Sequence, residues 1–282
     1  LVLTATQSWF PSASTAYNGT SWAVSTLFFF YAVFPAFVAW SKRLDQRRLW
    51  TALCATWMMV LLPAVVVLVT EEGRRPPQGS IEYWLLHSLP VGRLAEFLFG
   101  VVLCKLYLRG GGVRRVNGTL LSAGALTALL LVLARSRELP YALLHNGLVT
   151  PLHAMIILGV ASGRGGLTWV LSHPKMRVLG DASLSLYLLH VPFLYWGLFL
   201  VKKVTPLDSV SGEAAFLAGY AVLCIGASIL TTRFIVDPVA VFLKDRLPGA
   251  FSGWRRRLGF LAPAMLRRRR TPERPERLLY KG

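Results

Sequence analysis

The chain alternates between long apolar runs and short polar segments rich in Arg, Gly and Pro. Several of the apolar runs reach the ~20 residues that a helix needs to cross a bilayer. We therefore predict an all-α fold, a polytopic transmembrane bundle with about seven spans. The predicted helices are Trp22–Trp40, Trp50–Thr70, Pro90–Leu108, Val116–Ala134, Tyr141–Ala161, Ser183–Val201 and Ala214–Val236.

Three of these helices contain an internal proline, namely Pro35, Pro63 and Pro192. A proline within a helix deprives the carbonyl four residues earlier of its usual donor. In a membrane protein we expect a neighbouring helix to satisfy that carbonyl.

Composition agrees with a membrane protein, because 54% of the residues are hydrophobic and only 16% are charged. The cysteines Cys54, Cys104 and Cys224 all fall inside apolar runs. We expect buried thiols rather than a disulfide framework.

The net charge of +18 would suit a nucleic-acid partner, but its distribution indicates membrane topology instead. One set of alternate loops, together with the C-terminal tail, holds 23 Lys and Arg, and the other set holds seven. Basic residues concentrate on the cytoplasmic side of membrane proteins. The pattern predicts an N-terminus outside and a C-terminus in the cytoplasm of a bacterial inner membrane or other cell membrane, with no nucleic acid bound.

Two parts are predicted along the chain, a transmembrane domain over residues 1–240 and a basic cytoplasmic tail over 241–282. Within the tail, apolar residues recur at helical spacing beside Arg255–Arg257 and before Arg267–Arg270. A basic amphipathic segment of this kind lies on anionic headgroups. A solvated tail that only stops translocation explains the same residues.

His190 lies within a predicted span, where an ionisable group is costly and usually faces a bundle interior or a wet cavity. Ser183, Tyr187, His190 and Leu194 are three to four residues apart and share one helical face. An imidazole at this depth can relay a proton or hold a carbonyl oxygen, with Tyr187 as a neighbouring donor. A purely interhelical hydrogen bond explains it equally well.

Arg93 and Glu96 are three residues apart near the outer end of another predicted span, so we expect them to pair on one helix face. The pair serves either to orient the helix or to present a fixed cation to an anionic substrate group.

His145 and His153, eight residues apart with Asn146 between them, are expected on roughly one face of the fifth span. Metal ligation is disfavoured because no third ligand accompanies them at a usual spacing. We predict an interhelical hydrogen-bonding role for both histidines and no metal cofactor.

Motifs of soluble enzymes, such as a nucleophile elbow, a P-loop or a dinucleotide fingerprint, are absent. Four stretches instead resemble, in order, motifs of the integral-membrane acyltransferase family 3, which includes bacterial O-antigen and exopolysaccharide O-acetylases. The stretches are "SWAVSTLFFFYAVFP" from Ser21, "RLAEFLFG" from Arg93, "LGDASLSLYLLHVP" from Leu179 and "TTRFIVDP" from Thr231. The resemblance covers almost the whole chain except the tail.

Two positions depart from the family pattern, since Leu27 and Val236 stand where the family has Glu, and Asp237 follows the second. A lost carboxylate can neither accept a proton nor pair with a cation. The family has about ten spans, the first of which carries an Arg-x(10)-His motif with a histidine thought to be catalytic. We therefore expect this chain to be an N-terminally truncated member that lacks the front spans.

The resemblance implies transfer of an acyl group, most often acetyl from acetyl-CoA, to a hydroxyl of a carbohydrate or lipid-linked acceptor. His190, Tyr187, Arg93 and Glu96 are the implied site residues, lining or bracing the cavity while the base comes from the upstream histidine. Basic cytoplasmic loops would attract the phosphates of CoA.

A second hypothesis is a catalytically inactive relative that acts as a transporter or assembly partner in glycan export. The two missing carboxylates favour it. A generic seven-helix receptor or channel fits only the number of helices.

Overall fold

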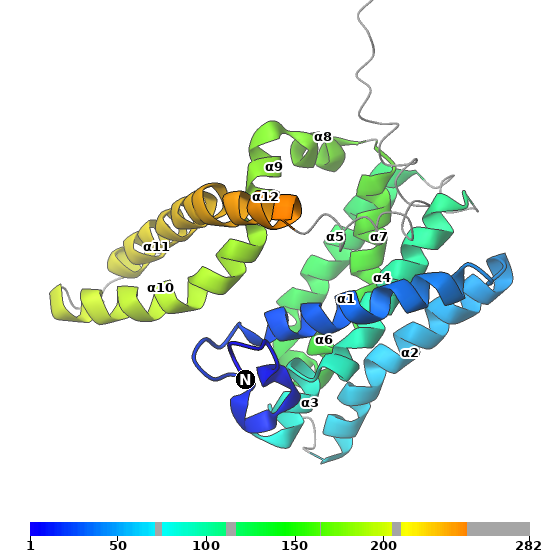
Figure 1. Cartoon of the computed structure of the whole chain (residues 1–282), viewed down its shortest axis with the longest axis horizontal. Coiled ribbons are helices and arrows are strands. Elements are labelled where there is room, and N and C mark those ends of the chain that lie inside the picture. The colour runs from blue at the N-terminus through cyan, green and yellow to red at the C-terminus, as the bar shows by residue number, and fades with distance from the viewer. Residues whose placement is uncertain (71–74, 111–116, 164, 205–209, 247–282) are drawn as a thin grey trace, which may run out of the picture. The chain divides into compact units, whose positions relative to one another are not determined.

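The computed structural model describes residues 1–70, 75–110, 117–163, 165–204 and 210–246 (Figure 1). These residues form helices and the turns between them, and none of them forms a β-strand. The α-helices are α1 (Trp22–Ser41), α2 (Gln46–Thr70), α3 (Ile81–His87), α4 (Pro90–Leu108), α5 (Gly118–Ala134), α6 (Tyr141–His145), α7 (Thr150–Ala161), α8 (Gly166–Ser172), α9 (Pro174–Asp181), α10 (Ser183–Val204), α11 (Val210–Thr231) and α12 (Asp237–Arg246). A first compact unit, Leu1–Thr232, ends where a second begins at Arg233.

The prediction of an all-α polytopic membrane protein is confirmed. Five helical segments are long and apolar enough to cross a membrane: Trp22–Ser41, Gln46–Thr70, Tyr141–Ala161, Ser183–Val201 and Gly212–Leu243. The other two predicted spans also fold as helices. They fall short of a plain hydrophobic span because α4 carries Arg93, Glu96 and Lys105, and α5 is only 17 residues long.

The predicted fifth span, Tyr141–Ala161, is not one continuous helix. α6 ends at His145 and α7 begins at Thr150. The expectation that His145 and His153 share one helical face is therefore wrong, since each lies on its own helix. The side chain of His153 is exposed.

Local backbone geometry explains this break. Gly147 has a φ of +92°, and a Cβ at that position would lie 2.5 Å from Leu61 Cδ2. Only glycine adopts such a left-handed conformation without strain. Trp57 Nε1 donates to the Gly147 carbonyl at 2.9 Å, and Pro151 occupies the first turn of α7, where proline is favoured.

The last predicted helix, Ala214–Val236, also differs in detail. α11 ends at Thr231, a π-helical turn covers Thr232–Val236, and α12 continues from Asp237. Short π-helical turns often occur at functional sites. This one contains the "TRFIV" of the fourth matched stretch, and Val236 and Asp237 are both exposed at its end.

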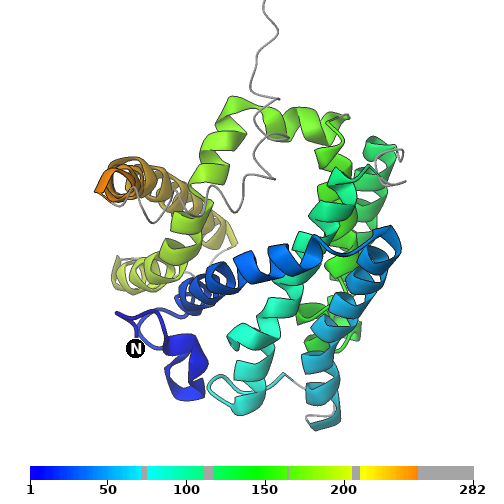
Figure 2. The same cartoon turned by 45° about the vertical axis from the view of Figure 1, so that its right-hand side comes forward.

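Within the first unit, helices that are distant in sequence pack side by side. α4 lies along both α1 and α2, and α5 lies along α7, as both views show (Figures 1 and 2). The close approach of α5 to α7 depends on glycine, because a Cβ on Gly118 would lie 2.6 Å from the Gly159 carbonyl oxygen. Three buried clusters lie between helices: Leu49, Val102 and Leu106 between α2 and α4; Ala64, Val67, Leu86 and Ala142 among α2, α3 and α6; and Phe99, Leu103 and Ala154 between α4 and α7.

Candidate functional site

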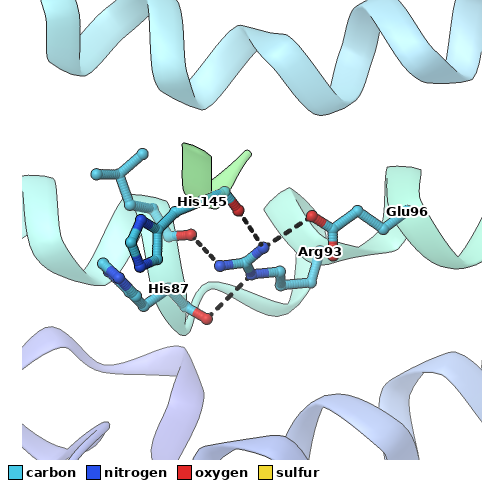
Figure 3. Close-up of polar contacts among 5 residues, drawn as sticks. His87, Arg93, Glu96 and His145 are labelled. Carbon is cyan, nitrogen blue, oxygen red and sulfur yellow. Dashed lines mark hydrogen bonds and ion pairs between the residues drawn. The ribbon is translucent and has the colours of Figure 1, made fainter. Parts of the chain in front are cut away.

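The predicted ion pair between Arg93 and Glu96 is present at the start of α4 (Figure 3). Arg93 Nη1 lies 2.8 Å from Glu96 Oε1, and 13% of the Arg93 side chain is exposed. The same guanidinium donates to three main-chain carbonyls: that of His87 from Nε at 3.1 Å, that of His145 from Nη1 at 3.4 Å, and that of Leu86 from Nη2.

These carbonyls belong to two helix C-termini. α3 ends at His87 and α6 ends at His145. The last carbonyls of a helix have no donor within the helix and form the negative end of its dipole. A planar guanidinium with five N–H groups can serve several of them at once. Arg93 thus joins α3, α4 and α6, which makes it a positioning residue in this geometry.

Aromatic side chains surround the same helix ends. The His87 ring stacks on the Tyr83 ring with centroids 4.2 Å apart, and the centroids of the His145 and Tyr141 rings are 4.0 Å apart. The two histidine rings are 5.2 Å apart. Arg75 lies over the Tyr141 ring at 5.2 Å, as in a cation–π contact.

The hydrogen bonds of His87 define its neutral tautomer. Nδ1 lies 3.0 Å from the Tyr83 carbonyl, which can only accept, so Nδ1 carries the proton. Nε2 therefore accepts from the Tyr141 hydroxyl at 2.9 Å. Burial is the main cause that lowers the pKa of His87 from 6.5 to about 4, and the Arg93 charge adds to it.

The first two matched stretches meet across α1 and α4. Arg93 lies 5.9 Å from the centre of the Trp22 ring. Phe97 stacks on Phe30 at 4.7 Å and meets Phe34 edge-on at 5.8 Å. Leu27, at the position of the family's Glu, is half-buried on α1.

The third and fourth stretches meet in the same way. Ser185 Oγ on α10 and Thr232 Oγ1 after α11 are 2.8 Å apart, and both residues are buried. The Tyr220 hydroxyl of α11 donates to the His190 carbonyl of α10 at 2.7 Å. Two polar contacts thus tie α10 to α11.

His190 and Tyr187 line a cavity of about 490 Å³ between α10 and α11. His190 Nδ1 lies 2.7 Å from the Tyr187 carbonyl, so Nδ1 carries the proton and the lone pair of the neutral ring is on Nε2. The two rings are 5.7 Å apart. A half-buried imidazole in this position can accept a proton or a hydrogen bond from a hydroxyl group.

Pro192 shapes this helix, and a distant residue compensates for it. The carbonyl that lacks its helical donor is that of Leu188, four residues before the proline. Asn18 Nδ2 donates to that oxygen at 2.8 Å. The carbonyl freed by Pro192 does find a donor outside its own helix, but this donor belongs to the N-terminal segment and not, as predicted, to a neighbouring helix.

The structure thus arranges the four predicted site residues in two pairs. Arg93 and Glu96 form one, and Tyr187 and His190 form the other.

Sequence reasoning missed His87, Tyr141, Tyr220 and Asn18. Tyr220 and Cys224 share a helical face, which was a usable signal, whereas nothing in the sequence links Asn18 to Leu188. No group of metal-ligating side chains occurs in the part of the chain that the structure describes. The predicted amphipathic tail, with Arg255–Arg257 and Arg267–Arg270, lies outside the described residues.

Comparisons with known proteins agree with the paired motifs. Residues 1–233 match the model of a family described as an acyltransferase domain. Acyltransferase MdmB of Streptomyces mycarofaciens is 28% identical over 262 residues, covering 86% of this chain. The chain spans 64% of the length of that relative. No solved structure gives a significant match.

Proposed function

Because this chain belongs to the acyltransferase domain family, we propose that the protein transfers an acyl group, acetyl in the simplest case, from acyl-CoA to a hydroxyl of a carbohydrate or lipid-linked acceptor. The family match over residues 1–233 carries this proposal. The relative that matches most of the chain is itself named an acyltransferase. Polysaccharide O-acetylation is the form of this reaction that we propose first.

The reaction needs a proton acceptor and donors for an oxyanion. The acceptor hydroxyl attacks the thioester carbonyl, a C–O bond forms, the C–S bond breaks, and the hydroxyl proton leaves while the CoA thiolate is protonated. In this proposal Nε2 of His190 accepts a hydrogen bond from the hydroxyl, whose proton passes to the upstream histidine that the family resemblance implies, and the Tyr187 phenol donates to the developing oxyanion. Arg93 acts through position, because its guanidinium holds the ends of α3 and α6, and Glu96 pairs with that guanidinium.

Orientation remains a prediction from the distribution of basic residues. It places the C-terminus and the loop with Lys42, Arg43, Arg47 and Arg48 in the cytoplasm, where CoA is present. Those cations would raise the local concentration of the CoA phosphates. We propose the lipid bilayer and the acceptor as partners, and no metal in the reaction.

Substitution of His190 tests the proposal. In the full-length protein, His190→Ala should lower acyl-transfer turnover by about 100-fold, the effect of losing a positioned acid–base or oxyanion group. His190→Gln keeps a hydrogen-bonding side chain but cannot titrate at neutral pH. Turnover well above that of His190→Ala would indicate hydrogen bonding, and turnover as low as that of His190→Ala would indicate proton transfer. The measurement is release of free CoA thiol together with formation of the ester.

His153→Ala is the matched control, because it makes the same change at an exposed histidine of α7 and should turn over like the parent. Parent-like turnover of a folded His190→Ala variant would contradict the role of His190. A folded parent with no transfer at all would favour the catalytically inactive relative, for which Leu27 and Val236 are the supporting residues.

A further inference from the structure

Residues 162–182 connect two segments that are long and apolar enough to cross a membrane, Tyr141–Ala161 and Ser183–Val201. Because one segment ends where the connector begins and the other begins where it ends, both ends of the connector lie at the same membrane surface. The connector contains α8 and α9, and only Ala182 separates α9 from α10. Its position at the surface follows from its two flanking segments and does not depend on any other part of the protein.

α8 directs a hydroxyl group towards the protein and its apolar side chains away from it. The helix packs on α5 and α7 without continuing the direction of α7 (Figures 1 and 2), and Thr168 Oγ1 donates to the Val160 carbonyl at 3.2 Å. Trp169, Val170 and Leu171 are 76%, 44% and 45% exposed. A short surface helix in water normally has the opposite arrangement, whereas the membrane interface favours exposed apolar side chains and Trp above all.

α9 adds cations beside these apolar side chains. Lys175 and Arg177 are both exposed, and α9 contacts α8. The sequence has no acidic residue between Glu138 and Asp181, so no carboxylate within the connector precedes these cations. Lys and Arg can rest their methylene groups on apolar surface while their charged ends reach phosphate oxygens. The connector therefore combines the two features of a segment that lies on anionic headgroups.

We propose that α8 and α9 form a binding surface for anionic phospholipid headgroups, with the apolar side chains of α8 at the level of the upper acyl chains and the cations of α9 on the phosphates. A zwitterionic headgroup offsets its phosphate with an ammonium, so these cations favour a lipid with a net negative charge. The inference goes beyond the proposed function and does not depend on it. Because α9 packs on α10 and α11, the bound lipid also fixes the depth of the helix that carries His190.

The test is photo-crosslinking of the full-length protein in vesicles made of equal amounts of phosphatidylcholine and phosphatidylglycerol. A trace of phosphatidylglycerol carries a diazirine near its glycerol backbone, and a parallel sample contains phosphatidylcholine with the same diazirine. Labelled residues are mapped by mass spectrometry after digestion with chymotrypsin, so labelling of the basic tail is counted separately. We expect the phosphatidylglycerol probe to label residues 166–178 more strongly than the phosphatidylcholine probe, and added salt to reduce the difference.

A matched pair of double variants sharpens the test. Lys175→Gln with Arg177→Gln removes the two cations and should lower the preference for phosphatidylglycerol at residues 166–178 about fivefold, which is the contribution of at least one cation near a membrane surface. Arg135→Gln with Arg137→Gln is the control. It removes two exposed cations at the same spacing, just after the end of α5, and should leave labelling of residues 166–178 unchanged.

Each other outcome overturns the proposal. Absence of label from residues 166–178, with label elsewhere on the protein, would show that protein rather than lipid covers α8 and α9. Equal labelling by the two probes would show contact with the membrane but no binding of anionic headgroups. An equal effect of the two double variants would show that the cations of α9 have no special part in it. The comparison of the two probes on the unmodified protein decides the matter even if a variant fails to fold.

Discussion

Arg93 is used for the shape of its side chain as well as for its charge. Its acceptors are one carboxylate and three carbonyls from two helix ends. A lysine ammonium could not face all of these oxygens with fixed geometry. The i, i+3 spacing is enough to predict the pair with Glu96, because both residues lie within one turn. The carbonyl partners could not be predicted, since they depend on where α3 and α6 end.

His87 gives a prediction for stability against pH. Its folded-state pKa of about 4 lies below the ordinary 6.5. Between these values the unfolded chain binds a proton that the folded protein does not, so acid favours unfolding. Thermal stability of the detergent-solubilised protein should fall as the pH drops from about 6.5 towards 4 and stay level just above that range.

Substitution isolates the contribution of His87 from those of other titratable groups. His87→Gln should flatten the decline between about pH 6.5 and pH 4, while His153→Gln, at an exposed histidine of α7, should leave it unchanged. Equal slopes for the parent and His87→Gln would show that His87 titrates normally in the folded protein.

At the scale of the element, α10 depends on the contact between Asn18 and the Leu188 carbonyl. Asn18→Ala should destabilise the folded protein by about 1 kcal/mol, the size of a polar contact in a membrane protein. In a Pro192→Ala background the helix supplies its own donor to Leu188, so the same substitution should cost close to nothing. Asn18 Oδ1 also accepts hydrogen bonds from Thr20. Asn18→Ala removes these bonds in both backgrounds, so their contribution cancels in the double-mutant cycle of Asn18→Ala and Pro192→Ala.

The measurement for this cycle is denaturant or thermal unfolding of the four proteins. Equal costs of Asn18→Ala in the parent and in the Pro192→Ala variant would contradict the compensation. The comparison needs only stability, so it is independent of any assumption about activity.

Hydropathy predicts where helices occur in this chain much better than where they break. The long runs of α1, α2, α4 and α10 begin or end within a few residues of the expected positions. The gap between α6 and α7 was missed because the run is apolar throughout, and a left-handed Gly147 has no effect on hydropathy. The short helices α3, α8 and α9 were missed because they have too few residues to show a period.

At the scale of the whole molecule, motifs that are distant in sequence pair up in space. Trp22, Phe30 and Phe34 of the first stretch meet Arg93 and Phe97 of the second. Ser185 of the third meets Thr232 of the fourth. The order of motifs in the sequence indicates the family, but only packing shows which motifs are neighbours. The cavity next to His190 could not be predicted, because it depends on how α11 packs on α10.

The most direct test of acyl transfer follows both the acyl group and the oxygen that receives it. Purified full-length protein is incubated with acyl-CoA labelled in the acyl group and a panel of alkyl glycosides whose hydroxyls carry heavy oxygen, and products are analysed by mass spectrometry. We predict an ester that contains the labelled acyl group and keeps the heavy oxygen, formed in equal amount to free CoA. Hydrolysis of the thioester without an ester product, or no reaction with any acceptor of the panel, would contradict the proposed function.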